Sequence, residues 1–519
     1  MLASLLCVGG PAAVLTPADA ESPYHQFCKK AAKEGDTSAR ALKRCYYTDV
    51  VVGNQGDLPE LGRGEFNQLL LNRGGKARFD VERLPPGPTG IVATPVLDPV
   101  TGEIIEFEIT FKKGSPTTTA AVALADVDGD GDLDVFVANH GFLDPDLFDV
   151  RAGESNVLLI NQGGGTFKAR ALDKGLQIRN NTHVAAGDLD NDGDIDFLVT
   201  SDGNPVRMYK NDGKGNFTVT DVTPGVDGFD HLGNPVRYAE VGFFTGEPRR
   251  SLHVALGDLN GDGLLDALVA YDGDSDQVLI NNGGGSFTVT NITPLEVDGT
   301  VYLDTEAVVI ADLDGDGFLD ALFVFDGDGA VVAWNDGSGN FTLEALPDTE
   351  GMHSKDVVIG DFDGDGYFDA IVVNTSLADD LGIVVEFPQL LRNNGDRTFE
   401  VITLEGTGLQ RRVSSGGRAT RGEAIVAADF DGDGDLDVII GNVTVRGVDA
   451  LERNYMLRND GLDADGNIIF TAITVAGGSR VTDGLAAGDL NGNGFVPAVL
   501  NKLPNINVDG LLPGRFPTP

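Results

Sequence analysis

The chain repeats one short acidic loop six times, and each copy leads directly into an apolar segment rich in β-branched residues. The loop has the form Asp-x-Asp/Asn-x-Asp-Gly-x-x-Asp, and successive copies start between 49 and 70 residues apart. A pattern that recurs on a loose period of about 60 residues indicates a repeat architecture with one loop in each unit. The copies begin at Asp126, Asp188, Asp258, Asp312, Asp361 and Asp429.

Each loop places oxygen-bearing side chains at alternate positions of a tight turn, with a glycine that permits the turn and a final Asp that closes it. Calcium takes about six to eight oxygen ligands, so the pattern predicts one Ca²⁺ per loop and about six ions in the chain. The predicted ligands are Asp126, Asp128, Asp130 and Asp134; Asp188, Asp190, Asp192 and Asp196; Asp258, Asn260, Asp262 and Asp266; Asp312, Asp314, Asp316 and Asp320; Asp361, Asp363, Asp365 and Asp369; and Asp429, Asp431, Asp433 and Asp437.

Three other interpretations of the loops fit less well. Ordinary acidic surface turns would not keep the glycine and the last Asp in register, and Mg²⁺ seldom takes an all-protein cage. An EF-hand needs a Glu at loop position 12 and flanking helices. Position 12 is apolar here, as at Val137 and Ile440, and it lies within strand-like runs. A seventh, eroded copy begins at Asp489 and has Pro497 in place of the closing Asp, so we expect weak or no ion binding there.

The repeat unit is clearest in residues 183–220, which read as four short strands. The acidic loop joins the first two strands, and a glycine-rich turn that starts at Asn211 leads to Phe217 at the start of the fourth. Four antiparallel strands per repeat are typical of a β-propeller blade. The loop and the Asn-x-Gly-x-Gly-x-Phe turn together resemble the FG-GAP/VCBS family of integrin-α-like repeats. That resemblance covers roughly residues 45–500 and implies calcium in the loop between the first two strands of a blade.

The two ends of the repeat region predict a shared blade. Residues 48–84 read as the second, third and fourth strands of a blade, and the segment that starts at Gly484 reads as a first strand. We therefore predict an all-β fold, a seven-bladed β-propeller over residues 48–500 followed by a tail over 501–519. A further second strand at Ala498 would make eight blades, which is the alternative.

Charge and hydropathy restrict the partners. The formal net charge is −44, and about six calcium ions would return about +12 of it. Nucleic-acid binding needs basic patches, so we expect no nucleic-acid partner. No apolar run reaches about 18 residues, so we expect a chain that does not span a membrane.

The first 20 residues resemble a secretory signal, with an apolar run from Leu2 to Val8 and a cleavage site near Ala20, although a basic segment is missing. Residues 21–47 then form an N-terminal segment that contains Cys28 and Cys45. In an oxidising compartment this pair predicts a disulfide, and two free buried thiols are the alternative. We expect a secreted or cell-surface protein.

In an antiparallel blade, the acidic loops and the Asn-Gly turns lie on one face of the ring. The long connections over 84–118, 139–156, 226–252, 374–388 and 403–423 fall on the opposite face, where we expect binding. The last of them is basic, which suits a protein or acidic-glycan partner. Its arginines can equally pair with neighbouring carboxylates. They are Arg411, Arg412, Arg418 and Arg421.

A second candidate site lies where the first strands start, close to the central channel. Ionisable residues at its mouth can bind a metal or act as acid and base. The alternative is a set of polar residues at exposed strand ends. The residues are His183, His253, Glu306, Asp356, Glu423 and Asp483.

The sequence has no nucleophile elbow, P-loop or HExxH zinc motif. The leading hypothesis is therefore a secreted, calcium-stabilised propeller that binds a protein or glycan, with calcium in a structural role. One alternative is a polysaccharide lyase or glycosidase with its site at the channel mouth. Another is a structural subunit of a surface layer or filament.

Overall fold

The structure is a computed structural model of the 519-residue chain. It describes residues 49–54, 67–72, 79–85, 90–97, 104–112, 118–140, 142–144, 149–152, 154–174, 176, 179–223, 227–229, 235–237, 250–273, 275–292, 296–297, 300–301, 304–375, 378–379, 382–383, 387–404, 422–442, 453–479 and 482–490. Several predictions lie outside these residues: the signal peptide, Cys28 and Cys45, the loop with Arg411, Arg412, Arg418 and Arg421, and the tail.

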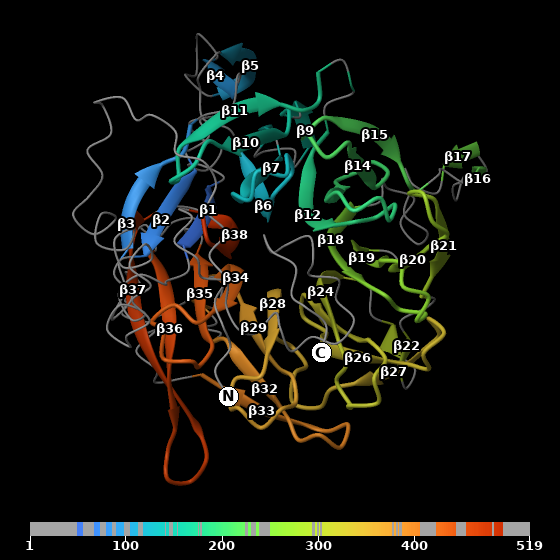
Figure 1. Cartoon of the computed structure of the whole chain (residues 1–519), viewed down its shortest axis with the longest axis vertical. Coiled ribbons are helices and arrows are strands. Elements are labelled where there is room, and N and C mark those ends of the chain that lie inside the picture. The colour runs from blue at the N-terminus through green and yellow to red at the C-terminus, as the bar shows by residue number, and fades with distance from the viewer. Residues whose placement is uncertain are drawn as a thin grey trace.

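Seven four-stranded antiparallel sheets are arranged around a common centre as the blades of a propeller (Figure 1). Blade 1 contains β6 (Thr119–Ala125), β7 (Asp134–Asn139), β10 (Val157–Asn161) and β11 (Phe167–Ala171). Blade 2 contains β12 (Asn181–Gly187), β13 (Asp196–Ser201), β14 (Arg207–Asn211) and β15 (Phe217–Asp221). Blade 3 contains β18 (Arg250–Gly257), β19 (Asp266–Asp272), β20 (Gln277–Asn281) and β21 (Phe287–Asn291).

The remaining blades follow the same order. Blade 4 contains β24 (Thr305–Ala311), β25 (Asp320–Phe325), β26 (Gly329–Asn335) and β27 (Phe341–Ala345). Blade 5 contains β28 (Ser354–Gly360), β29 (Asp369–Asn374), β32 (Gln389–Asn393) and β33 (Phe399–Thr403). Blade 6 contains β34 (Gly422–Ala428), β35 (Asp437–Asn442), β36 (Arg453–Leu462) and β37 (Ile468–Ser479).

Blade 7 is built from both ends of the repeat region. Its inner strand is β38 (Thr482–Gly488), which pairs antiparallel with β1 (Asp49–Asn54), and β2 (Gln68–Asn72) and β3 (Phe79–Arg83) complete the sheet. The inner strand β38 contacts both β34 and β6, so the ring is closed. The predicted seven-bladed propeller with a shared blade is confirmed, and the eight-bladed alternative is wrong.

The apolar core lies between blades. Second strands are buried along almost their whole length, whereas fourth strands alternate between partly buried and exposed residues. In the layer between blades 1 and 2, Phe136 packs against Phe197 with ring centroids 4.5 Å apart and against Tyr209 at 5.3 Å. Each of the seven buried clusters combines side chains of two adjacent blades, so the stability of one blade depends on its neighbours.

Five hairpins among the described residues are added to the blades. They are β4 (Gly90–Leu97) with β5 (Ile104–Lys112), β8 (Phe142–Asp144) with β9 (Asp149–Ala152), β16 (Asp227–Phe229) with β17 (Pro235–Arg237), β22 (Glu296–Val297) with β23 (Thr300–Val301), and β30 (Ala378–Asp379) with β31 (Gly382–Ile383). Each hairpin lies in a connection between a second and third strand or between one blade and the next. All five therefore belong to the face opposite the acidic loops. The described residues contain no helix that is long and apolar enough to cross a membrane.

Candidate metal loops and channel cluster

The acidic loops are numbered by the blade that contains them, so loop 1 belongs to blade 1. In loops 1, 2, 3, 4 and 6, the first Asp of the acidic loop holds the turn together through backbone hydrogen bonds. Asp126 Oδ1 accepts from the amide of Gly129 at 2.8 Å, and Oδ2 accepts from the amide of Gly131 at 2.9 Å. Gly131 has φ of 90°, in the left-handed region that glycine adopts at little cost. The loop therefore brings its carboxylates together because of its own local geometry, as the sequence predicted.

The closing Asp of each loop is buried in the sheet. In loop 1, Asp134 Oδ2 accepts from the amide of Val127 at 3.0 Å, and Oδ1 accepts from the amide of Asn161 at 2.7 Å. Burial raises the pKa of Asp134 to about 7 despite these bonds, and the neighbouring carboxylates of Asp128 and Asp130 raise it further. The same burial raises the pKa of Asp437 in loop 6 to about 8. A nearby cation would relieve this unfavourable charge.

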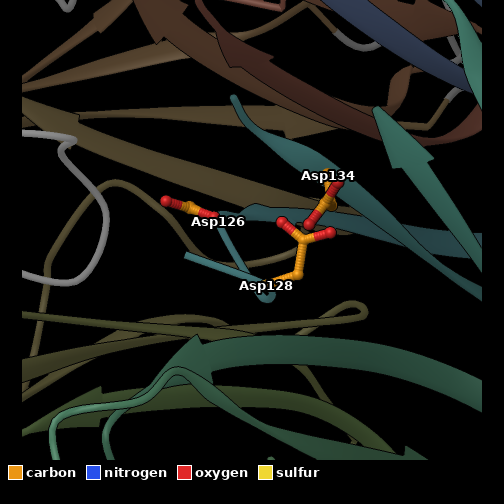
Figure 2. A group of neighbouring side chains, drawn as sticks. All are labelled: Asp126, Asp128 and Asp134. Carbon is orange, nitrogen blue, oxygen red and sulfur yellow. The ribbon is translucent and has the colours of Figure 1, made fainter. Parts of the chain in front are cut away.

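Four loops bring together carboxylates at positions 1, 3 and 9. Figure 2 shows the loop 1 group, in which the carboxylates of Asp126, Asp128 and Asp134 converge. In each group, one oxygen from each residue lies within 4.8 Å of the others. The corresponding groups are Asp188, Asp190 and Asp196; Asp361, Asp363 and Asp369; and Asp429, Asp431 and Asp437.

The predicted ligand sets and the structure differ at some positions. The Asp at position 5 stays outside these four groups, and in loop 1 Asp130 Oδ1 accepts from the amide of Asp132 at 3.0 Å instead. Loop 4 groups positions 1, 3 and 5, and leaves out Asp320. In loop 3, Asn260 Nδ2 donates to Asp262 Oδ2 at 3.1 Å, an internal bond that an all-carboxylate loop cannot form. The residues outside these groups are Asp130, Asp192, Asp365, Asp433 and Asp320 together with all four ligands of loop 3, Asp258, Asn260, Asp262 and Asp266.

The donor set fits a hard cation. Oδ1 atoms of Asp128, Asp190 and Asp431 are buried and have no hydrogen-bond partner. A buried carboxylate oxygen without a donor is costly unless a cation or water satisfies it. Because all the grouped ligands are oxygens, these loops can hold metal ions of the calcium type.

A structural role that the sequence missed belongs to the Asn that ends each third strand. In blade 4, Asn335 Nδ2 donates to the carbonyl of Leu319 at 2.9 Å in its own loop and to that of Leu259 at 2.8 Å in the loop of blade 3. The Asn-Gly turns had indicated these residues only as turn starters. Equivalent bonds of 2.7 to 2.9 Å to the preceding loop come from Asn72, Asn161, Asn211, Asn281, Asn393 and Asn459.

The residues predicted at the channel mouth occupy two adjacent levels rather than one. Register shifts near the start of the inner strands leave Glu306, Glu423 and Asp483 unpaired, whereas His253 and Asp356 are paired in the next position. The bulge lies at the same distance from the loop in these blades, and the residues on one level lie five residues before their loop, whereas those on the other level lie six before. The sequence prediction had placed all of these residues just before the first strands as one ring, without separating the two spacings.

The structure brings three of these residues together. The imidazoles of His183 and His253 stack with centroids 3.7 Å apart, and His253 Nε2 lies 3.9 Å from Asp356 Oδ1. His183 Nδ1 accepts from the amide of Val254, and Asp356 Oδ2 accepts from that of Ile425, so both side chains join their blade to the next. Burial lowers the pKa of His183 to about 4 and raises that of Asp356 to about 7.

Lys355, which the sequence did not indicate, bridges two blades on the other level. Its Nζ lies 2.5 Å from Glu306 Oε1 of blade 4 and 2.9 Å from Asp326 Oδ2 at the end of the second strand there. Burial raises the pKa of Glu306, although Lys355 opposes this, and burial raises that of Asp483 with a further contribution from Glu423. The sequence prediction named its neighbour Asp356 as the channel-mouth residue of blade 5, so Lys355 was not among the candidates.

Comparison with known proteins identifies the repeat. A family model for the FG-GAP-like repeat matches residues 144–199, 188–236, 258–323 and 312–372. The chain carries FG-GAP-like repeats. Four overlapping matches to these repeats confirm the predicted resemblance, and the repeats coincide with blades that each contain an acidic loop. No curated protein matches the chain.

The chain with these FG-GAP-like repeats is also similar, at low sequence identity, to several solved structures. One is the crystal structure of BBS1N in complex with ARL6DN, at 10% identity and a TM-score of 0.41, covering 70% of this chain and 86% of that one. Another is the exotype rhamnogalacturonan lyase YesX, at 13% identity and a TM-score of 0.37, covering 83% and 78%. A third is the Bacillus licheniformis rhamnogalacturonan lyase PL11, at 14% identity, a TM-score of 0.38 and the same coverage.

Proposed function

We propose that this chain is a secreted or cell-surface interaction propeller that binds Ca²⁺ in its acidic loops and a protein or acidic glycan on the opposite face. The observation that carries this proposal is that the extra hairpins and the acidic loops lie on opposite faces of the ring. All five extra hairpins lie in connections on one face, whereas all six complete acidic loops lie on the other. Elaborated loops on a rigid scaffold are where binding usually occurs.

Calcium has a structural role in this proposal. The buried closing carboxylates and the buried oxygens without hydrogen-bond partners in loops 1, 2 and 6 create an unfavourable cluster of negative charge. An ion bound to these loops neutralises the cluster and fixes the turn between the first two strands. A millimolar calcium concentration outside the cell would fill even weak loops of this kind.

The binding proposal is tested by removing one hairpin. The variant replaces residues 90–112, which form β4 and β5, with a short glycine-serine linker. The matched control changes the opposite face through Lys214→Ser in the turn between β14 and β15. Both proteins and the wild type are applied, with calcium, to an acidic-glycan array and to intact cells of the source organism.

We expect the wild type and the Lys214→Ser protein to bind alike, and the hairpin variant to bind at least about tenfold more weakly, as for loss of a few central contacts. Equal binding by all three proteins would remove this hairpin from the site. Binding lost in the Lys214→Ser protein alone would place the working face on the side of the acidic loops.

A second candidate function, polysaccharide lyase or glycosidase, is favoured by the convergence of His183, His253 and Asp356 in the channel. Burial holds the pKa of both imidazoles below its usual range, so they are neutral bases at neutral pH. The test is incubation with acidic polysaccharides and detection of new reducing or unsaturated ends. Cleavage that is lost in His253→Gln, with wild-type stability retained, would replace the interaction proposal with this one.

A further inference from the structure

The residue directly before the Asn that ends each third strand differs among blades in one chemical property. Blades 2, 5 and 6 have a cation there, Lys210, Arg392 and Arg458. Blades 1, 3 and 4 have Ile160, Ile280 and Trp334. These positions are partly buried or buried in the third strand, close to the acidic loop of the same blade.

Each of the three cations contacts the Asp at position 3 of its own loop. Lys210 Nζ pairs with Asp190 Oδ2, and it lies 3.5 Å from Asp192 Oδ2. In blade 5, Arg392 places both Nε and Nη2 on Asp363 Oδ2, at 2.7 and 2.6 Å. The contacted carboxylates are nearly buried, with exposed side-chain fractions of 1% in both cases.

The pairing in blade 6 is looser. Arg458 Nε lies 3.9 Å from Asp431 Oδ2, while its Nη2 is 2.6 Å from Asp460. Blade 4, which has Trp334 at this position, receives its cation from the next blade. Arg397 pairs with Asp314 at position 3 of loop 4, and its guanidinium lies 5.1 Å from the centroid of the Trp334 ring.

Loops 1 and 3 differ from the other four. Within the described part of the chain, no ion pair joins their carboxylates to Lys or Arg. Arg170 affects Asp128 only through space, as the smallest of the influences on its pKa. Loops 1 and 2 have the same five carboxylates, at positions 1, 3, 5, 7 and 9, so the pair Ile160 and Lys210 is a natural comparison.

We propose that the Lys or Arg paired with the carboxylate at position 3 is an internal counter-ion that competes with Ca²⁺ for that carboxylate. The residue before the third-strand Asn supplies it in loops 2, 5 and 6, and Arg397 supplies it in loop 4. This inference rests on the proposed calcium binding. An arriving Ca²⁺ must displace the Lys or Arg or share the Asp with it, and the like charges repel. Loops 2, 4, 5 and 6 are then stabilised without the ion but bind it more weakly, whereas loop 1 binds it most tightly. Loop 3 also has no counter-ion among the described residues, but Asn260 and Leu264 leave it with three carboxylates where loop 1 has five.

The test exchanges the residues that precede the third-strand Asn in blades 1 and 2. Lys210→Ile removes the counter-ion of loop 2, and Ile160→Lys adds one to loop 1. Lys210→Arg keeps the charge. Lys168→Ile removes the same charge from an exposed site on β11, which forms no ion pair with an acidic loop among the described residues. Bound calcium is measured by equilibrium dialysis over a range of free Ca²⁺, and melting temperatures are measured in chelator.

We expect the free Ca²⁺ concentration that half-fills one site to fall roughly fivefold in Lys210→Ile. It should rise by a similar factor in Ile160→Lys, as for loss or gain of one partly exposed ion pair. In chelator, Lys210→Ile should melt below the wild type, while Lys168→Ile and Lys210→Arg should not. If Lys168→Ile shifts calcium binding as much as Lys210→Ile, general surface charge is responsible and the inference is wrong.

The outcome also separates this inference from the calcium proposal. Wild-type protein that binds calcium with unchanged midpoints in both exchange variants overturns the counter-ion and leaves the calcium proposal intact. Wild-type protein that binds no calcium overturns both. If Lys210→Ile and Ile160→Lys both fail to fold, Lys210→Arg decides. Because it keeps the charge, the inference requires it to keep wild-type calcium binding and stability, and a loss of either would overturn the inference.

Discussion

The side-chain amide of Asn161 donates a 2.9 Å hydrogen bond to the backbone carbonyl of Leu490, a residue 329 positions further along the chain. This bond joins the end of the third strand of blade 1 to the eroded loop of blade 7. Six other blades form the same bond to the loop that precedes them, so a closed circle of seven buried bonds runs beneath the acidic loops. The circle couples each loop to the packing between blades.

Removing one bond of this circle should destabilise the whole ring. Asn335→Ala deletes two donors to buried carbonyls and the acceptor for the amides of Gly337 and Gly339. Because buried groups are left unpaired, we expect the free energy of unfolding to fall by about 3 kcal/mol. Urea denaturation measures it. Asn340→Ala, which loses only exposed bonds to Asp336, is the control and should change stability by less than about 0.5 kcal/mol.

Chelation of calcium should lower the melting temperature. A ligand that binds only the native state stabilises it by about 2.7 kcal/mol per site at a hundredfold excess over its dissociation constant. We therefore expect a calorimetric melt in EDTA to occur many degrees below the melt in calcium. Magnesium added in place of calcium serves as the control and should restore little of the difference. Identical melts in EDTA and calcium would contradict a structural role for the ion.

The stability of the calcium-free protein should decrease as pH rises. Burial raises the pKa of the closing carboxylates from 3.8 to about 7 in Asp134, Asp196 and Asp369, so the folded state binds more protons than the unfolded state between these values. Stability gained by this proton uptake is present at low pH and is lost as pH rises through the folded pKa. Urea denaturation in EDTA should give a larger free energy of unfolding at about pH 5.5 than at about pH 8.

Calcium should reverse this trend, because the ion binds the ionised carboxylates and competes with protons. Its stabilising effect should therefore be greater at the higher pH. A calcium-free protein whose stability rises steadily across the same range would show that other carboxylates, with lowered pKa values, dominate the pH dependence.

Loss of β38 should prevent the ring from closing. A chain that ends at residue 481 lacks the inner strand of blade 7, so β1 loses its partner and the apolar faces of β34 and β6 are left uncovered. We expect this protein to aggregate or to be cut rapidly by protease. Adding a peptide of residues 482–490 should restore part of the protease resistance, because the peptide supplies the missing strand. A stable, protease-resistant monomer without the peptide would contradict the shared blade.

Much of the fold was predictable because its repeats have strong local signals. The acidic loop fixes where the first strand ends and the second begins, and its glycine at positions such as Gly131 has the left-handed conformation that the turn requires. The Asn-Gly turns fix the ends of the third and fourth strands in the same way. Blade number followed from counting these signals and from finding that the two ends of the chain carry complementary parts of one blade.

The candidate sites were predictable only in part. The sequence prediction treated the six ionisable residues as one ring, but they occupy two levels. Three lie five residues before the first Asp of their loops and three lie six before, and Lys355 belongs to the second level. The six are His183, His253, Asp356, Glu306, Glu423 and Asp483. Within the loops the sequence prediction expected four equivalent side-chain ligands, whereas positions 1, 3 and 9 converge in four of the six. The one-residue difference in spacing to the loop was visible in the sequence, whereas the bulge that makes the two positions face differently is a feature of the paired strands.

The sequence by itself determined the repeat, the strand order within a blade and the residues of the acidic loops, because these depend on contacts between residues close together in the chain. Only the tertiary structure decided how blades are joined. The bond from Asn335 to Leu259, the stacking of His183 on His253 and the bridge from Lys355 to Glu306 each connect different blades. Such contacts depend on the closure of the ring, which sets the distance between segments that local patterns describe one at a time.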